Sequence, residues 1–133
     1  MERCKREYIN AHGGGILLFD SKYYWFGEHR PAKGFSTEVG VTCYSSTDLC
    51  NWRYEGVALS VSEEAGNEIE KGCIMERPKV IYNKRTKKFV MWFHLELKGK
   101  GYEAAVREWL SVILRRDLIV LFLRVVSALE YFR

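Results

Sequence analysis

The chain has 133 residues, a length that suits one domain of ordinary size. Its hydrophobic content of 47% and charged content of 29% are ordinary for a globular protein. The net charge of +4 is mild and scattered, which argues against a dedicated nucleic-acid binder. The one basic cluster, residues 84–88, falls where a hairpin turn is expected, and we interpret it as a solvated turn.

The first part of the chain alternates short apolar segments with turn residues. Residues 17–19 and 23–26 predict two strands joined by a tight turn at residues 20–22. A third strand is predicted at residues 39–44 and a fourth at 52–59, separated by turn chemistry. Four short strands with short turns form a meander, which is the unit of a β-propeller blade.

A second unit begins after residues 63–72, an acidic connector without clear periodicity. Residues 79–82 and 89–95 predict two further strands around a turn at 83–87. This pattern repeats the opening hairpin roughly 65 residues later. Two such units cannot close a propeller, because each blade needs a neighbour on both faces.

The last part, residues 106–133, contains no glycine, proline, asparagine, lysine or threonine. Its leucine, arginine, glutamate and alanine content predicts a helix. The longest apolar run, residues 118–123, is much shorter than the ~18–20 residues of a membrane span. The sequence at the N-terminus lacks the apolar segment of a signal peptide.

The four cysteines lack the C-x-x-C spacing of a zinc site, so no metal site is predicted. Reduced, half-buried thiols are expected. A pairing of Cys43 with Cys50 across two strands stays open, because sequence alone does not establish connectivity.

Several strings resemble glycoside hydrolase family 43, and within it the exo-acting galactan β-1,3-galactosidases. They are A-H-G-G-G-I-L at residues 11–17, Y-Y-W-F-G-E at 23–28, E-R-P-K-V-I-Y-N at 76–83 and V-M-W-F-H at 90–94. The strings occur in the family's order and cover residues 8–105. The resemblance implies an all-β fold, a partial five-bladed β-propeller consisting of the first one and a half to two blades.

The family cleaves glycosides with inversion, which needs an acid and a base roughly 6.5–9.5 Å apart. The resemblance implies that the acid glutamate comes from a later blade, and no residue of this chain matches its motif. The catalytic pair is therefore incomplete here, and whether the chain is an enzyme stays open. No cofactor is expected.

The resemblance assigns four residues to the near side of a sugar pocket. Glu76, before Arg77 and Pro78, matches a family glutamate that contacts sugar hydroxyls or tunes the acid. Glu28 matches a second inward glutamate, Tyr102 matches a tyrosine after the V-M-W-x-H strand, and His12 lines the same opening. Each has a plain alternative: a solvated glutamate at a strand end, or a histidine that bonds locally in a turn. The aromatic side chains of these strands form either a sugar platform or, more commonly, core.

Residues 106–133 depart from the family pattern. Codons can be chosen for residues 105–133 such that the neighbouring reading frame contains S-D-S-P-T-G-P, a turn typical of the family's next strands. We therefore divide the chain into an incomplete propeller domain, residues 1–105, and an out-of-frame, non-homologous apolar tail, residues 106–133. Exposed sheet faces and the tail favour self-association.

The leading hypothesis is a fragment of a hydrolase whose family removes galactose from β-1,3-galactan or arabinogalactan-type glycans, inactive by itself. Two alternatives stay open: a non-catalytic carbohydrate-binding module, and an interaction protein that uses its apolar tail. Neither a nucleic acid nor a membrane span is expected. Full-length relatives are typically secreted or periplasmic, so the localisation of this chain stays open.

Overall fold

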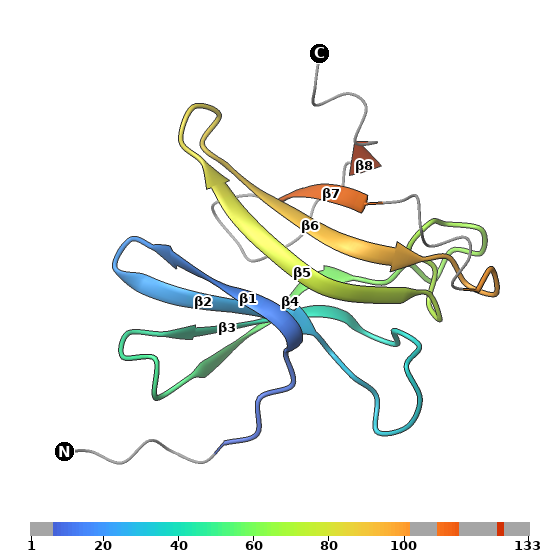
Figure 1. The fold of residues 1–133 in the computed structure, drawn as a ribbon, viewed down its shortest axis with the longest axis horizontal. Coiled ribbons are helices and arrows are strands. Elements are labelled where there is room, and N and C mark those ends of the chain that lie inside the picture. Colours follow the sequence, from blue (N-terminus) through green and yellow to red (C-terminus); the bar gives the residue numbers. More distant parts are fainter. Residues whose placement is uncertain (1–6, 102–108, 115–124, 127–133) are drawn as a thin grey trace.

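The computed structural model describes residues 7–101, 109–114 and 125–126, and these ranges contain strands and no helix. The chain forms two four-stranded antiparallel sheets, one after the other in the sequence, and neighbouring strands in each sheet are consecutive in the chain (Figure 1). The first sheet consists of β1 (His12–Phe19), β2 (Lys22–Glu28), β3 (Gly40–Ser46) and β4 (Arg53–Ser60). The second consists of β5 (Ile74–Asn83), β6 (Lys88–Glu96), β7 (Trp109–Leu114) and β8 (Val125–Val126).

Local turn chemistry fixes the register of the hairpins. Between β1 and β2, Asp20 and Ser21 have φ angles of 47° and 59°, as a two-residue turn that matches the twist of the strands requires. Between β5 and β6, the side-chain oxygen of Asn83 accepts hydrogen bonds from the backbone nitrogens of Arg85 (3.0 Å) and Thr86 (3.1 Å). Both turns confirm the sequence prediction, and the basic cluster lies at the second one.

The core lies between the two sheets, where β1 and β2 contact β5 (Figure 1). On β6, the alternate residues Met91, Phe93 and Leu95 are buried in this layer, as the two-residue period of a strand dictates. The largest side chains with no more than 2% exposure are Phe93, Leu59, Ile69, Met75, Met91 and Leu95. Ile69 belongs to the acidic connector, which therefore contributes to the core although its sequence shows no periodicity.

The cysteines differ from the expectation of half-buried thiols. Cys50 is disulfide-bonded. Cys43 and Cys73 are free and completely buried, so the Cys43–Cys50 pairing left open above is not formed. Burial raises the pKa of the Cys43 thiol to about 12 and that of Cys73 to about 11.

These two thiols should resist alkylation in the folded protein, because the reactive thiolate is both inaccessible and scarce at neutral pH. We expect iodoacetamide at pH 8 to leave Cys43 and Cys73 unmodified in the native state and to modify both in guanidinium chloride. Mass spectrometry of the digested protein measures this. Native-state alkylation of Cys43 would contradict the burial described here.

The helix predicted for residues 106–133 is not found where the structure describes that segment. β7 pairs with β6 from Phe89↔Leu114 to His94↔Trp109, and β8 pairs with β7. The free edge of β6 offers backbone donors and acceptors to an extended partner, and this outweighs local helix propensity. The rest of the tail lies outside the described residues.

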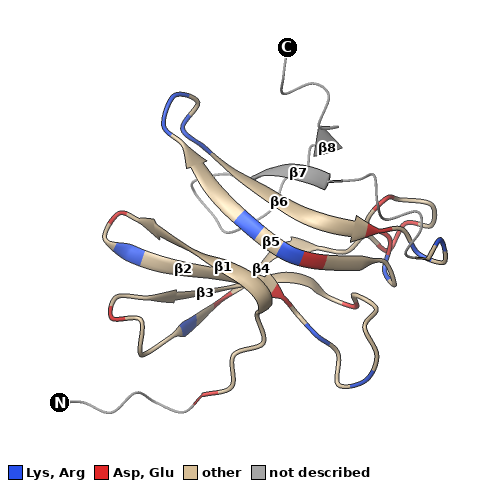
Figure 2. Cartoon of the chain, viewed as in Figure 1, with Lys and Arg blue, Asp and Glu red and all other residues tan. Residues whose placement is uncertain are grey.

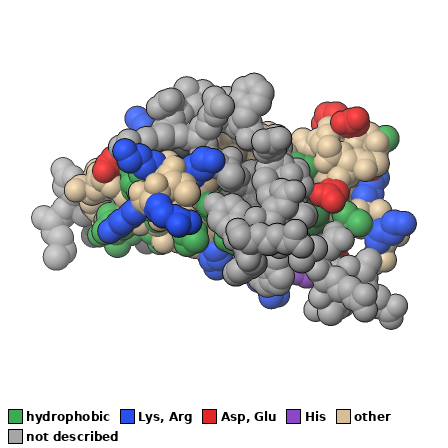
Figure 3. All heavy atoms as spheres, turned by 90° about the horizontal axis from the view of Figure 1, so that it is seen from above, with side chains coloured by type: hydrophobic (Ala, Val, Ile, Leu, Met, Phe, Trp, Pro, Cys, Tyr) green, Lys and Arg blue, Asp and Glu red, His purple; other side chains and the backbone are tan. Residues whose placement is uncertain are grey.

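The surface shows no basic stripe along the described strands. Figure 2 shows Lys and Arg mainly at turns and singly on strands, with an acidic and a basic segment side by side on β5. In the view of Figure 3, Lys and Arg are seen at both ends of the molecule, and most of the acidic side chains in view lie toward one end. No helix in the described ranges is long and apolar enough to cross a membrane.

Ile16 and Leu18 are more than half exposed on β1. Self-association through this sheet stays a prediction.

Candidate functional site

The three glycines of the opening motif form an irregularity at the start of β1. His12 lies opposite Glu28 and Gly15 opposite Phe26, so the register shifts between these pairs. Gly13 has a φ of 57° and is left-handed. A Cβ on Gly14 would lie 1.7 Å from the carbonyl oxygen of Phe26, which leaves room only for glycine. The glycines therefore bring the backbone of β1 unusually close to β2 and place His12 and Glu28 side by side.

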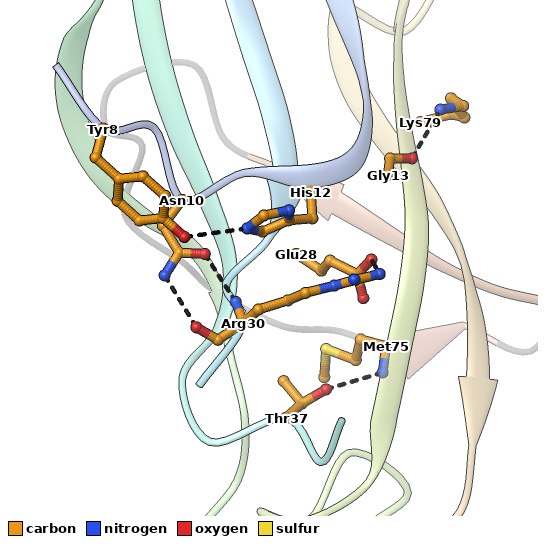
Figure 4. A network of polar contacts seen from close by, with 9 residues as sticks. All are labelled: Tyr8, Asn10, His12, Gly13, Glu28, Arg30, Thr37, Met75 and Lys79. Carbon is orange, nitrogen blue, oxygen red and sulfur yellow. Dashed lines mark hydrogen bonds and ion pairs between the residues drawn. The ribbon is translucent and has the colours of Figure 1, made fainter. Parts of the chain in front are cut away.

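Glu28 is a buried carboxylate, with 7% of its surface exposed. Its Oε1 accepts a hydrogen bond from Nη2 of Arg30 at 2.9 Å, and this ion pair offsets part of the cost of burying the charge. Figure 4 shows the two side chains lying along each other and reaching toward β5. A Cβ on Gly13 would lie 3.0 Å from Glu28 Oε1 and 3.7 Å from the backbone nitrogen of Arg77. The Glu28 carboxylate therefore lies close to the residue that follows Glu76.

β5 carries a second irregularity at this point. Its register with β6 shifts between Glu76 and Lys79, and Arg77 has a φ of 55°, which is uncommon for a residue other than glycine. Pro78 has no N–H group and so donates nothing to the ladder. Lys79 Nζ donates to the carbonyl oxygens of Gly13 (3.2 Å) and Gly14, which ties β5 to the irregular start of β1 (Figure 4). Two bulges thus adjoin, and such bulges are common beside active sites because they redirect side chains.

Glu76 is half-buried and belongs to a cluster with two residues of β6. It lies directly opposite His94 in the ladder, and Glu96 follows two residues later on the same face. His94 Nε2 lies 3.2 Å from Glu96 Oε1, and one donor atom of each residue lies within 4.8 Å of the others. The arrangement combines two carboxylates and an imidazole, groups that bind hydroxyls, move protons or ligate a metal ion.

The chain before β1 and the loop after β2 hold this region in place. His12 Nε2 lies 3.4 Å from the hydroxyl of Tyr8. The buried Thr37 accepts a hydrogen bond from the backbone nitrogen of Met75 at 2.9 Å through its hydroxyl (Figure 4). The loop therefore fixes the start of β5, one residue before Glu76.

Several solved structures are similar to this chain in fold and in sequence. A family 43 β-1,3-galactosidase, solved with galactodeoxynojirimycin, is 68% identical over 79% of this chain, with a TM-score of 0.75. An exo-β-1,3-galactanase from Phanerochaete chrysosporium, solved with galactose, is 37% identical over 79% of the chain, with a TM-score of 0.68. Another, from Clostridium thermocellum, is 37% identical over 90%, with a TM-score of 0.69. The chain belongs to glycoside hydrolase family 43.

The match to family 43 covers most of this chain but a minor part of each relative. The chain spans 30% of the galactosidase, 23% of the fungal galactanase and 24% of the clostridial one. Among curated proteins, the raffinose invertase of Escherichia coli is 23% identical over 94 residues, 71% of this chain and 19% of that protein. No family model matches the chain. The resemblance inferred from the sequence motifs is confirmed, together with the all-β class.

The structure brings some of the site residues suggested by the resemblance together and does not describe others. Glu28 lies opposite His12 and beside the backbone that carries Glu76. Tyr102 lies outside the described residues. Sequence reasoning missed His94 and Glu96 as partners of Glu76, although His94 ends a quoted family-43 string. The sequence does contain one indication: His94 and Glu96 are two residues apart on a predicted strand, which places both side chains on the same face.

A hollow beside the acidic connector, residues 63–72, is lined by acidic and basic side chains. Lys98 pairs with Glu70 at 2.6 Å, and Lys71 lies 3.8 Å from Glu38 and 3.7 Å from Glu63. These charges neutralise one another between the loop and the end of β6. We interpret them as structural contacts, because exposed ion pairs of this kind contribute little beyond local order.

Proposed function

We propose that this chain forms the near side of a galactose pocket in a family 43 hydrolase acting on β-1,3-galactan. The observation that carries the proposal is the pair of adjoining bulges, which brings His12 and Glu28 close to the segment containing Glu76. Carboxylates and an imidazole at one opening suit the recognition of sugar hydroxyls, which donate and accept hydrogen bonds. The relatives solved with galactose and with galactodeoxynojirimycin support the same class of ligand.

In this proposal the two sheets are the first two blades of a five-bladed propeller. Each is a four-stranded antiparallel meander, and their first strands β1 and β5 lie side by side, as the inner strands of neighbouring blades do. The general acid for inversion would come from the part of the relatives that this chain does not span. Without an acid and base on opposite sides of the glycosidic bond, we expect no turnover by this chain alone.

Binding of β-1,3-galactobiose, measured by isothermal titration calorimetry, tests the pocket. We expect saturable binding by the unmodified chain and a loss of about tenfold or more in Glu76→Gln and Glu28→Gln, because hydrogen bonds to charged groups contribute about 1.5–3 kcal/mol. Glu63→Gln, on an exposed loop, is the matched control and should bind like the unmodified chain. Equal binding by all four proteins would contradict the assignment of the pocket.

Turnover is measured separately, as galactose released from a β-1,3-linked oligosaccharide. We expect no release above that in buffer. Release that disappears in Glu76→Gln would show that this chain carries its own catalytic machinery and would contradict the proposed division of roles.

A further inference from the structure

The cluster of Glu76, His94 and Glu96 has the composition of a metal site. An imidazole nitrogen and two carboxylate oxygens are presented from two adjacent strands, with donor atoms within 4.8 Å of one another. Glu76 and His94 are ladder partners, and Glu96 follows His94 on the same face. The backbone that carries the three donors is therefore held by strand pairing, and only their side-chain rotamers need adjust.

The donors favour a particular class of ion. Imidazole suits Zn²⁺, Cu²⁺, Ni²⁺ and Fe²⁺, whereas Ca²⁺ takes six to eight oxygen ligands at 2.3–2.6 Å and Mg²⁺ retains most of its waters. Ligand distances of about 2.0–2.2 Å around tetrahedral Zn²⁺ place donor atoms about 3.4 Å apart. His94 Nε2 and Glu96 Oε1 are already 3.2 Å apart. Glu76 offers the third donor atom, within 4.8 Å of the other two.

We propose that Glu76, His94 and Glu96 bind one divalent transition-metal ion, with Zn²⁺ as the ion to test. Four other described groups that bind such ions are placed less favourably. His12 contacts the Tyr8 hydroxyl, Cys43 and Cys73 are completely buried, and Cys50 is disulfide-bonded. Among the described residues, Glu76, His94 and Glu96 form the one group of three histidine, cysteine or acidic side chains whose donor atoms lie this close together.

Calorimetric titration of the full chain with ZnCl₂ tests this site. We expect one saturable site that 1 mM CaCl₂ does not compete for. Affinity should fall by about tenfold or more in His94→Ala and in Glu96→Gln, since each removes a ligand. His12→Ala is the matched control and should retain the affinity of the unmodified chain. Absence of saturable binding, or equal affinity in all variants, would overturn the proposal.

A measurement on the unmodified protein removes any dependence on how the variants fold. The sequence has three histidines, so the ring-nitrogen resonances of each can be followed by NMR during the titration. Zn²⁺ should shift the His94 ring resonances and leave those of His12 and His29 in place. Shifts at His12 or His29 in place of His94 would overturn the assignment. The two proposals share Glu76, but the metal titration contains no sugar and the sugar titration no metal, so either proposal can fail without the other.

Discussion

Gly14→Ala is expected to destabilise the chain by about 3–5 kcal/mol, in the range of the largest single-residue effects. The added Cβ would lie 1.7 Å from the carbonyl oxygen of Phe26 and 2.7 Å from its carbonyl carbon. Both are main-chain atoms of the neighbouring strand, so relief requires β1 and β2 to separate at the place where they position Glu28. Native domains are stable by only about 5–15 kcal/mol, so the folded population should fall steeply.

Urea denaturation followed by circular dichroism measures this loss. Gly15→Ala is the matched control, because its Cβ would meet Cδ of Lys79 at 3.0 Å, and that flexible side chain can move aside. We expect Gly15→Ala to cost less than about 1 kcal/mol. Equal stability of the two variants would show that the close approach of β1 to β2 is absent in solution.

Phe93→Ala is expected to cost about 3–5 kcal/mol, because it removes a fully buried aromatic ring and leaves a cavity. Phe93 lies on β6 in the core that joins the two sheets, so its loss weakens the contact between them as well as the second sheet itself. The neighbouring core residues are held by strand pairing and should collapse only partly into the space.

The shift of the urea midpoint gives the size of this effect. Phe35→Ala, at a position 74% exposed in the loop between β2 and β3, is the control and should change the free energy of unfolding by less than about 0.5 kcal/mol. A small effect of Phe93→Ala would mean that the two sheets do not share the core described here.

Much of the fold could be predicted from local chemistry. The turn at Asp20 and Ser21 and the turn that follows Asn83 lie where their residue types indicate. The strands are longer than predicted: β1 begins at His12 and includes the three glycines, whereas the predicted strand begins at residue 17. Glycine has no side chain and gives no hydrophobic pattern. The glycine segment of β1 can therefore be recognised as a strand only from its pairing with β2. In the tail, local propensity indicated a helix, whereas pairing with β6 yields strands at Trp109–Leu114.

The candidate site was predictable only in part, for the same reason. Family resemblance pointed to His12, Glu28 and Glu76, but their proximity depends on two bulges that adjoin across different sheets. Glu28 and Arg30 are two residues apart, so their ion pair is local, but the burial of Glu28 depends on its pairing with β1. His94 and Glu96 become partners of Glu76 through the pairing of β5 with β6, a relationship that sequence spacing does not contain.

NMR titration with β-1,3-galactobiose locates the sugar site on the chain, since backbone amides report where a sugar binds. We expect saturable shifts confined to amides at the start of β1, the end of β2 and the β5 bulge, including Gly13, Glu28 and Arg77. Amides at the β5–β6 turn should stay unchanged. Shifts centred elsewhere, or none at millimolar sugar with the chain folded, would contradict the assignment of the pocket to these two bulges.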